Sequence, residues 1–379
     1  MNIFNEEFVD VLHDTLKEKP YCSAESYNEL MRLAEAESRW DTAPLQDDED
    51  QTLVSVIIPT HNRPDMLIRA VDSVLAQTHK ALEIIIVDDA STDDTMTRIP
   101  EHYAGESRVT YLRNEKSLGP GLTRRRGYLN SKGDFVIYLD DDDYYIEPRF
   151  FEKALAVHKE NPSLALVAGN TITYNNERGI CIYKLLNVSG FLKKEDYLLG
   201  FISKYDKPSS SFPSMFRRSM LESAGFKDMQ MMNDSSIYLR SLCFGDAYFL
   251  DMIVGIYVLH GSNISTALPH KFLMENLEEK KNIYHLAKAQ YTCDVSKWYR
   301  EQIYSSVRYY FAGTKSTAEQ RKEVLAWCDE NCGNVRLLLV RSGIRMVLKR
   351  INPIRLARKM YWHLRHLVKE QQKKHGGKS

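Results

Sequence analysis

Four consecutive aspartates, Asp140 to Asp143, directly follow an apolar segment with the composition of a buried strand. Phe, Val, Ile, Tyr and Leu occupy residues 135–139, and these residue types favour strands. Adjacent carboxylates repel one another unless a cation lies between them. Magnesium and manganese prefer oxygen ligands and often bridge to the phosphates of a substrate. The run therefore favours a divalent-metal site at the end of a strand, with an acidic loop or a helix cap as the alternative.

A second apolar segment, residues 82–87, also ends on two acids, Asp88 and Asp89. Further apolar strands are expected at 53–58 and 109–112, and helices at 64–75, 91–99 and 121–130. Alternating strands and helices are typical of a parallel α/β sheet, and strands covered by helices on both faces are nearly all apolar. We therefore expect an α/β fold with a mostly parallel central sheet, flanking helices and acidic residues along one edge.

The composition is that of an ordinary globular protein, with 379 residues of which 43% are apolar and 27% are charged. Six cysteines occur without a CxxC pair, which argues against a zinc site and a disulfide framework. The first residues lack the charged and apolar regions of a secretion signal, and no apolar run has the length of a membrane-spanning helix. These features predict a cytoplasmic protein.

The pattern along the chain predicts three parts. Residues 1–52 are expected to form a helical segment, interrupted at Pro20 and followed by an acidic linker. Residues 53–270 contain the α/β alternation, and residues 271–379 are rich in helical, aromatic and basic positions.

The formal net charge is zero, but the charges are unevenly distributed. Residues 1–53 contain 14 acidic and 4 basic side chains, whereas residues 333–379 contain 13 Lys or Arg and one acid. Segment 335–379 combines these basic residues with apolar ones at helical spacing, which predicts peripheral contact with an anionic membrane surface. The alternative is packing on the rest of the chain or on a second subunit. No nucleic-acid module is recognisable, so nucleic-acid binding is not expected.

Three ordered motifs carry a resemblance to a known family. They are VSVIIPTHNR at 54–63, IVDDASTD at 86–93 and YLDDDD at 138–143. Together they resemble glycosyltransferase family 2, whose members are inverting enzymes with the GT-A fold. The likeness covers roughly residues 53–265 and implies a nucleotide-sugar donor and a divalent metal, manganese or magnesium.

The resemblance assigns three residues to the nucleotide. Pro59 and Thr60 would lie beside the base, and Asp89 would accept a hydrogen bond from a base N–H. The alternative for Asp89 is a helix cap or an Asx-turn. Ala90 stands where the family commonly has glycine.

The resemblance also assigns the metal and diphosphate contacts. Asp140, Asp141 and Asp142 align with the family's DxD motif, with Asp140 near the ribose and the metal and Asp142 as a metal ligand. Arg124 would pair with the diphosphate, or else belong to a solvated basic helix face. Asp143 resembles an extra acid of the family and is expected to cap the following turn.

Inversion requires a general base that deprotonates the acceptor hydroxyl. Asp234 matches the family's base, although Asn233 replaces the acid that usually precedes it, and Asp234 could instead cap its helix. His260 is expected either near the metal and diphosphate or in a purely structural role.

The sequence thus predicts a metal-dependent inverting glycosyltransferase that uses a nucleotide sugar, with a UDP-sugar as the commoner family donor. The acceptor would be a saccharide or a lipid-linked molecule of bacterial surface-glycan synthesis. Two alternatives stay open: an inactive sugar-nucleotide-binding scaffold, suggested by Asn233, and a nucleotidyltransferase. The latter should carry a Gly-rich basic loop after its first strand, which residues 59–62 do not provide. A homo-oligomer, and peripheral attachment to the inner face of the cell membrane, are also open.

Overall fold

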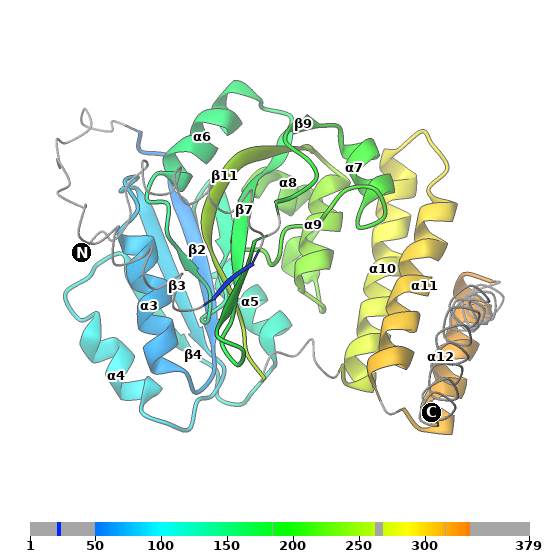
Figure 1. Cartoon of the computed structure of the whole chain (residues 1–379), viewed down its shortest axis with the longest axis horizontal. Helices are drawn as coiled ribbons and strands as arrows, with labels where there is room; N and C mark the ends of the chain where they lie inside the picture. The colour runs from blue at the N-terminus through cyan, green and yellow to red at the C-terminus, as the bar shows by residue number, and fades with distance from the viewer. Residues whose placement is uncertain (1–20, 24–49, 184, 262–267, 315, 334–379) are drawn as a thin grey trace, which may run out of the picture. The chain divides into compact units, whose positions relative to one another are not determined.

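The computed structural model of the chain describes residues 21–23, 50–183, 185–261, 268–314 and 316–333 (Figure 1). The chain divides into two compact units, Met1–Trp298 and Tyr299–Ser379. The first unit contains the sheet and the candidate site. The second contains most of α11 (Ser296–Gly313) and all of α12 (Ala318–Asn331).

The terminal predictions fall largely outside the described residues. Tyr21–Ser23 forms strand β1, which pairs antiparallel with β8 (Ile180–Tyr183), so the predicted helix is wrong for these three residues. Short helical periodicity could not anticipate pairing with a strand more than 150 positions away. The rest of the N-terminal segment and the basic tail at 335–379 lie outside the part of the chain that the structure describes.

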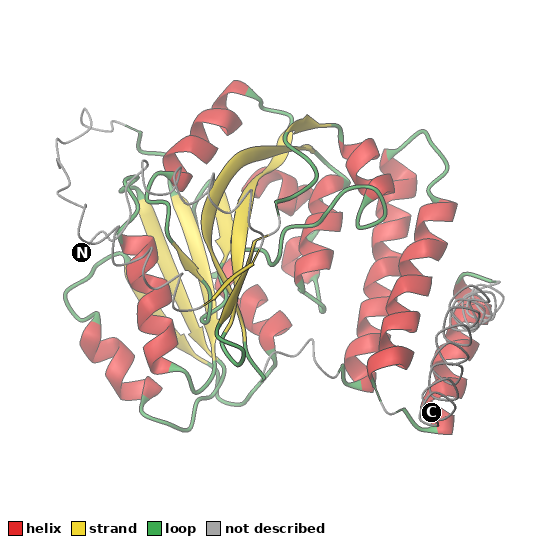
Figure 2. Cartoon of the chain, in the orientation of Figure 1, coloured by secondary structure: helices red, strands yellow, loops and turns green. Residues whose placement is uncertain are grey.

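The sheet contains eleven described strands, and its centre is parallel (Figure 2). Neighbouring parallel strands in the order β5, β2, β3, β4 are Phe135–Tyr138, Val54–Thr60, Leu82–Asp88 and Val109–Arg113. All four strands predicted from apolar runs are therefore confirmed, and the α/β class with them. Parallel strands place their carboxyl ends on one edge, so the acids that follow β3 and β5 lie at the same edge.

An antiparallel extension continues the sheet beyond β5. Strand β10 (Ser214–Arg217) pairs antiparallel with both β5 and β7 (Leu164–Asn175). The long β11 (Asp246–Leu259) runs parallel to β7 and also pairs antiparallel with the short β6 (Tyr144–Tyr145) and β9 (Gly190–Leu192). This extension brings segments from 207–217 and 257–260 back to the edge where β5 ends.

Helices cover both faces of the parallel strands. Helices α3 (Pro64–Leu75), α4 (Thr95–His102) and α6 (Phe150–Glu160) contribute to one apolar core with alternate residues of β2, β3 and β5. Helix α5 (Pro120–Leu129) covers the opposite face. A Cβ at Gly127 would lie 2.3 Å from the side chain of Ile57, so only glycine allows this close approach. The remaining helices of the first unit are α7 (Lys194–Gly200), α8 (Arg218–Ser223), the 3₁₀ turn η1 (Phe226–Asp228), α9 (Asp234–Leu242) and α10 (His270–Gln290).

Strand β2 extends past Pro59, where the sequence predicts its end. Pro59 pairs in register with Val87 of β3, but the pairing of β2 with β5 reaches only Ile57. Proline cannot donate a backbone hydrogen bond. At Pro59 the side of β2 that faces β5 is past the paired region, so the missing N–H does not interrupt the pairing of these two strands. Thr60 therefore still belongs to the strand and lies directly at the edge that carries the acids.

No helix among the described residues is long and apolar enough to cross a membrane.

Candidate active site

A cavity of about 470 Å³ lies at the edge where β2, β3 and β5 end. Its walls include eight of the nine residues that the sequence assigns to the site: Pro59, Thr60, Asp89, Arg124, Asp140, Asp141, Asp142 and Asp234. The ninth, His260, lies behind the wall, with Nε2 2.7 Å from Oδ2 of Asp142. The structure therefore brings all predicted site residues to one place, although their chemical roles remain predictions.

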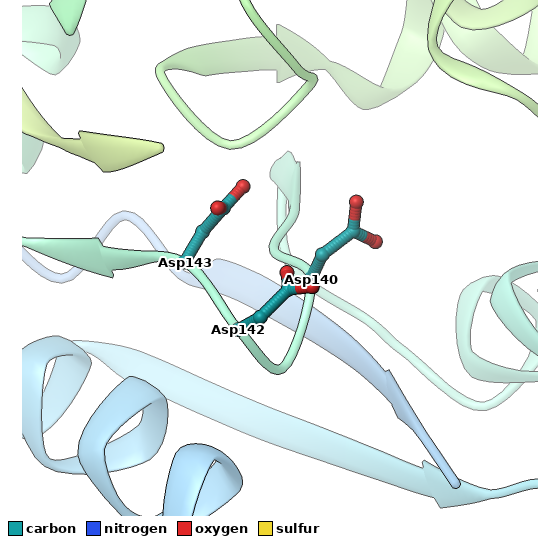
Figure 3. Close-up of side chains that lie close together, drawn as sticks. All are labelled: Asp140, Asp142 and Asp143. Atoms are coloured by element: carbon teal, nitrogen blue, oxygen red, sulfur yellow. The ribbon is translucent and has the colours of Figure 1, made fainter. Parts of the chain in front are cut away.

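The aspartate run turns sharply after β5, so its side chains do not alternate as they would in a strand. Asp143 N–H donates to the carbonyl oxygen of Asp140 over 3.1 Å, which closes the turn. Asp140, Asp142 and Asp143 each offer a carboxylate oxygen within 4.8 Å of the other two (Figure 3). Three converging carboxylates fit a hard divalent cation such as Mg²⁺ or Mn²⁺.

Asp143 enters this cluster although the sequence suggests only a turn cap. Its side chain is fully buried, and it accepts hydrogen bonds from Val258 N–H over 3.0 Å and from the Ser210 hydroxyl over 3.1 Å. Burial and the neighbouring acids raise the pKa of Asp143 well above its ordinary value. Both donors come from the antiparallel extension, so no local sequence signal marks this arrangement.

Burial also raises the pKa of Asp141 to about 7, while Arg63 and the Thr60 hydroxyl oppose the rise. Thr60 donates to Oδ2 of Asp141 over 2.7 Å. Burial raises the pKa of Asp140 to about 6 against the opposing effect of Arg124. The acids at the end of β5 are therefore costly to ionise together, and added positive charge would favour their ionised form.

Arg124 joins the acidic run to the predicted base. Its Nη2 pairs with Asp140 and lies 3.9 Å from Oδ1 of Asp234, and its Nη1 donates to the Met232 carbonyl over 3.1 Å. Only 8% of Arg124 is exposed, so it is not part of a solvated basic face. Although burial alone would lower its pKa, the two carboxylates raise the pKa of Arg124 above its ordinary value.

Asp234 is the first residue of α9 and does not cap it. The cap is Asn233, whose side chain accepts from Ser236 N–H over 2.9 Å in a reciprocal capping box. Asp234 therefore keeps its carboxylate for the cavity, where the Ser211 hydroxyl donates to Oδ1 over 3.1 Å. Asn233 thus has a structural role at the start of this helix.

Asp89 has a different environment, because its carboxylate already accepts five hydrogen bonds. Two come from the backbone N–H groups of Leu118 and Gly119, and three come from the side chains of Asn114, Ser117 and Thr123. These donors outweigh burial and lower the pKa of Asp89. Asp89 therefore fixes the turn that leads into α5 and contributes an anionic wall to the cavity.

The cavity includes residues that sequence reasoning missed. Arg63 contacts both Asp141 and Asp142, and its signal was its place as the last residue of the first motif. Tyr257, Leu268 and Phe272 form an apolar part of the wall.

Comparisons with known proteins find similar glycosyltransferases. The model of the family described as "Glycosyl transferase family 2" matches residues 55–224, which contain the three motifs except for Val54, the first residue of the first one. The GalNAc(5)-diNAcBac-PP-undecaprenol beta-1,3-glucosyltransferase of Campylobacter jejuni is 31% identical over 190 residues, 49% of this chain and 59% of that protein. The chondroitin synthase of Escherichia coli is 31% identical over 218 residues, 56% of this chain and 30% of that protein.

A third relative is the UDP-Glc:alpha-D-GlcNAc-diphosphoundecaprenol beta-1,3-glucosyltransferase WfaP of Escherichia coli. It is 39% identical over 94 residues, 25% of this chain and 37% of that protein. The chain thus spans less than two thirds of the length of each of these curated relatives. A solved structure of S. aureus TarS 1–349 in complex with UDP-GlcNAc is similar in fold, with a TM-score of 0.57 and 18% identity over 75% of this chain and 83% of that chain.

Proposed function

We propose that the chain is a metal-dependent inverting member of glycosyltransferase family 2, whose model matches residues 55–224. It would transfer a sugar from a nucleotide donor, with UDP as the expected nucleotide, to a lipid-linked or saccharide acceptor of bacterial surface-glycan synthesis. The observation that carries the proposal is the convergence of the acidic run and Asp234 on one cavity, joined by Arg124. Named relatives that act on undecaprenol-linked saccharides support the acceptor class.

The donor would occupy the cavity with its base toward Pro59, Thr60 and the wall formed by Asp89. Its diphosphate would lie at Asp140 and Asp142, where a divalent cation held by these acids and Asp143 would neutralise the charge of the leaving group. Arg124 holds Asp140 in place, and its positive charge balances part of the negative charge at this edge of the sheet.

Asp234 would act on the acceptor. In an inverting transfer the acceptor oxygen forms a bond to the anomeric carbon while the bond to the diphosphate breaks, and the electron pair leaves with the diphosphate. The Asp234 carboxylate would take the hydroxyl proton as the new bond forms. The contact from Ser211 fixes this carboxylate at the start of α9, and Tyr257 and Phe272 supply an apolar surface nearby for the acceptor.

Membrane contact through segment 335–379 belongs to the same proposal, because a lipid-linked acceptor lies at a membrane surface. The support is the charge of this part of the sequence, with 13 basic residues and one acid in 333–379. Its position relative to the site lies beyond the described residues.

The test is a transfer and donor-hydrolysis screen across sugar nucleotides, with Mn²⁺, with Mg²⁺ and with a chelator, using a polyprenyl-diphosphate-linked saccharide as acceptor. We expect one donor to react only with a divalent cation present, and NMR of the product to show inversion at the anomeric carbon. A protein that binds UDP-sugar without hydrolysis or transfer under all conditions would instead be the inactive scaffold. Retained configuration would contradict the assigned base.

A further inference from the structure

Arg63 contacts the acidic run, and its guanidinium places a positive charge beside the carboxylates that are expected to bind a metal ion. Its Nη1 lies 3.1 Å from Oδ1 of Asp141 and 3.1 Å from Oδ2 of Asp142. The same Asp142 oxygen is 2.7 Å from Nε2 of His260. Asp142, the residue expected to ligate the metal, thus already has one carboxylate oxygen bound to a positively charged guanidinium.

The backbone that carries Arg63 is fixed. Asn62 adopts a left-handed φ of 55°, and its side-chain oxygen accepts from Thr92 N–H over 2.7 Å. The Asn62 N–H donates to the Ser91 hydroxyl over 2.9 Å. These hydrogen bonds connect the turn between β2 and α3 to the loop after β3. The backbone of the turn is therefore held, and a change of partner at Arg63 requires only rotation of its long side chain.

The Arg63 side chain has room to move toward the cavity. It is 28% exposed, whereas those of Asp141 and Asp142 are 7% and 8% exposed, and it forms part of the cavity wall. Arg124, the other arginine of the wall, is buried and bound to Asp140 and Met232. Of these two cations, Arg63 is therefore the one that can exchange partners.

A cation on Oδ2 of Asp142 and a guanidinium on the same oxygen would repel each other in a poorly solvated environment. A nucleoside diphosphate entering with the cation brings new oxygens, and the planar guanidinium fork matches phosphate oxygens well. We infer that Arg63 pairs with Asp141 and Asp142 until a divalent cation takes its place, and that it then turns to the diphosphate of the donor. This inference rests on the proposed function and adds the role of one residue.

The exchange predicts opposite effects on two binding reactions. Removing the guanidinium in Arg63→Met frees Asp142, so Mn²⁺ alone should bind several-fold more tightly. The same substitution removes a diphosphate contact, so UDP in the presence of saturating Mn²⁺ should bind at least tenfold more weakly. A residue that merely stabilised the acidic turn would weaken both reactions.

The experiment measures free Mn²⁺ by electron paramagnetic resonance, and UDP binding by calorimetry, on the full-length protein. Arg98→Met is the matched control, because Arg98 pairs with Asp65 at the surface of α4, outside the cavity, and should change neither value. Circular dichroism establishes that each variant is folded. If Arg63→Met does not fold, Arg63→Lys keeps the charge without the fork and should leave Mn²⁺ binding unchanged while weakening UDP binding.

Unchanged affinities in Arg63→Met, or changes in the same direction, would overturn the inference. Equal UDP affinity in Arg63→Lys and wild type would do so as well. Failure of the metal-dependent donor site in the proposed function has a different outcome, since wild-type protein would then bind no Mn²⁺–UDP at all.

Discussion

Nη2 of Arg124 lies 3.9 Å from Oδ1 of Asp234, while the same guanidinium pairs with Asp140. The predicted base and the predicted metal site, which come from α9 and from the end of β5, therefore share one buried counter-charge. The position of each carboxylate depends on the other through Arg124.

Replacing Arg124 by Gln should reveal this dependence. Removing one partner of a buried charge pair typically lowers the free energy of unfolding by about 3–5 kcal/mol, because the remaining charge stays uncompensated. We expect a loss of that order in urea unfolding at pH 7.5, and a smaller loss at pH 5.5, where Asp140, with a pKa near 6, can accept a proton. An equal loss at both pH values would contradict the assigned charge balance.

Substitution of Asp142 by Asn should abolish turnover and weaken donor binding. The amide removes the anionic oxygen that His260 and Arg63 now contact, and with it a ligand for the cation. We expect the transfer rate to fall by a factor of at least about 10² and the Mn²⁺-dependent part of UDP affinity to be lost. Asp94→Asn, at an exposed position before α4, is the matched control and should behave like wild type. Full activity of Asp142→Asn would remove the metal assignment.

Substitution of Asp234 by Asn should separate binding from chemistry. Asn233 still caps α9, so the helix should form normally, but the amide cannot take the acceptor proton. We expect UDP-sugar affinity within about twofold of wild type and a transfer rate lower by roughly 10²–10⁴. Single-turnover transfer and calorimetry provide the two readouts. A wild-type rate would move the base to another residue.

The burial of His158 leads to a prediction of how the free energy of unfolding changes at acid pH. It is buried in α6, where Nε2 lies 3.1 Å from the Met215 carbonyl oxygen, and burial lowers its pKa to about 3. The unfolded state, with a pKa near 6.5, binds the proton first, so this residue makes the protein less stable as pH falls from about 6.5 toward 3. Its contribution approaches about 1.4 kcal/mol per pH unit in that range.

His158→Gln should remove that slope. Urea unfolding at pH 7, 6 and 5 compares the variant with wild type. As the pH falls, the free energy of unfolding of the variant should decrease less than that of wild type. A constant difference across the three pH values would show that His158 does not carry the effect.

The basic tail makes a further prediction from sequence. Deletion of residues 335–379 removes all 13 basic side chains of 333–379 that are expected to face an anionic leaflet. With about 1 kcal/mol per basic residue near such a surface, binding to anionic vesicles should fall by orders of magnitude. Vesicle cosedimentation measures the loss, and UDP binding checks that the catalytic part stays folded. Unchanged cosedimentation would refute membrane docking by this segment.

Local sequence features predicted the parallel half of the fold well. The runs of β2, β3, β4 and β5 are mostly apolar, and acids mark the ends of β3 and β5, so strand type and order follow from residue patterns. The alignment of carboxyl ends then places Asp89 and Asp140 at one edge.

The rest of the site depends on contacts that sequence spacing does not reveal. Arg63 lies 79 positions from Asp142, and Ser211 lies 23 positions from Asp234. Asp143 joins the cluster because β11 and the segment before β10 supply its hydrogen-bond donors. The partners of Asp143 and Asp234 depend on the antiparallel extension, whose strands follow no simple alternation with helices.

The most direct test is a crystal of the full chain grown with Mn²⁺ and UDP, with anomalous diffraction recorded near the manganese edge. We predict one anomalous peak within coordination distance of Asp142 and the UDP diphosphate, at the edge where Asp140 and Asp143 also converge. Ordered UDP in the cavity without a peak there, or a peak bound elsewhere, would contradict the account.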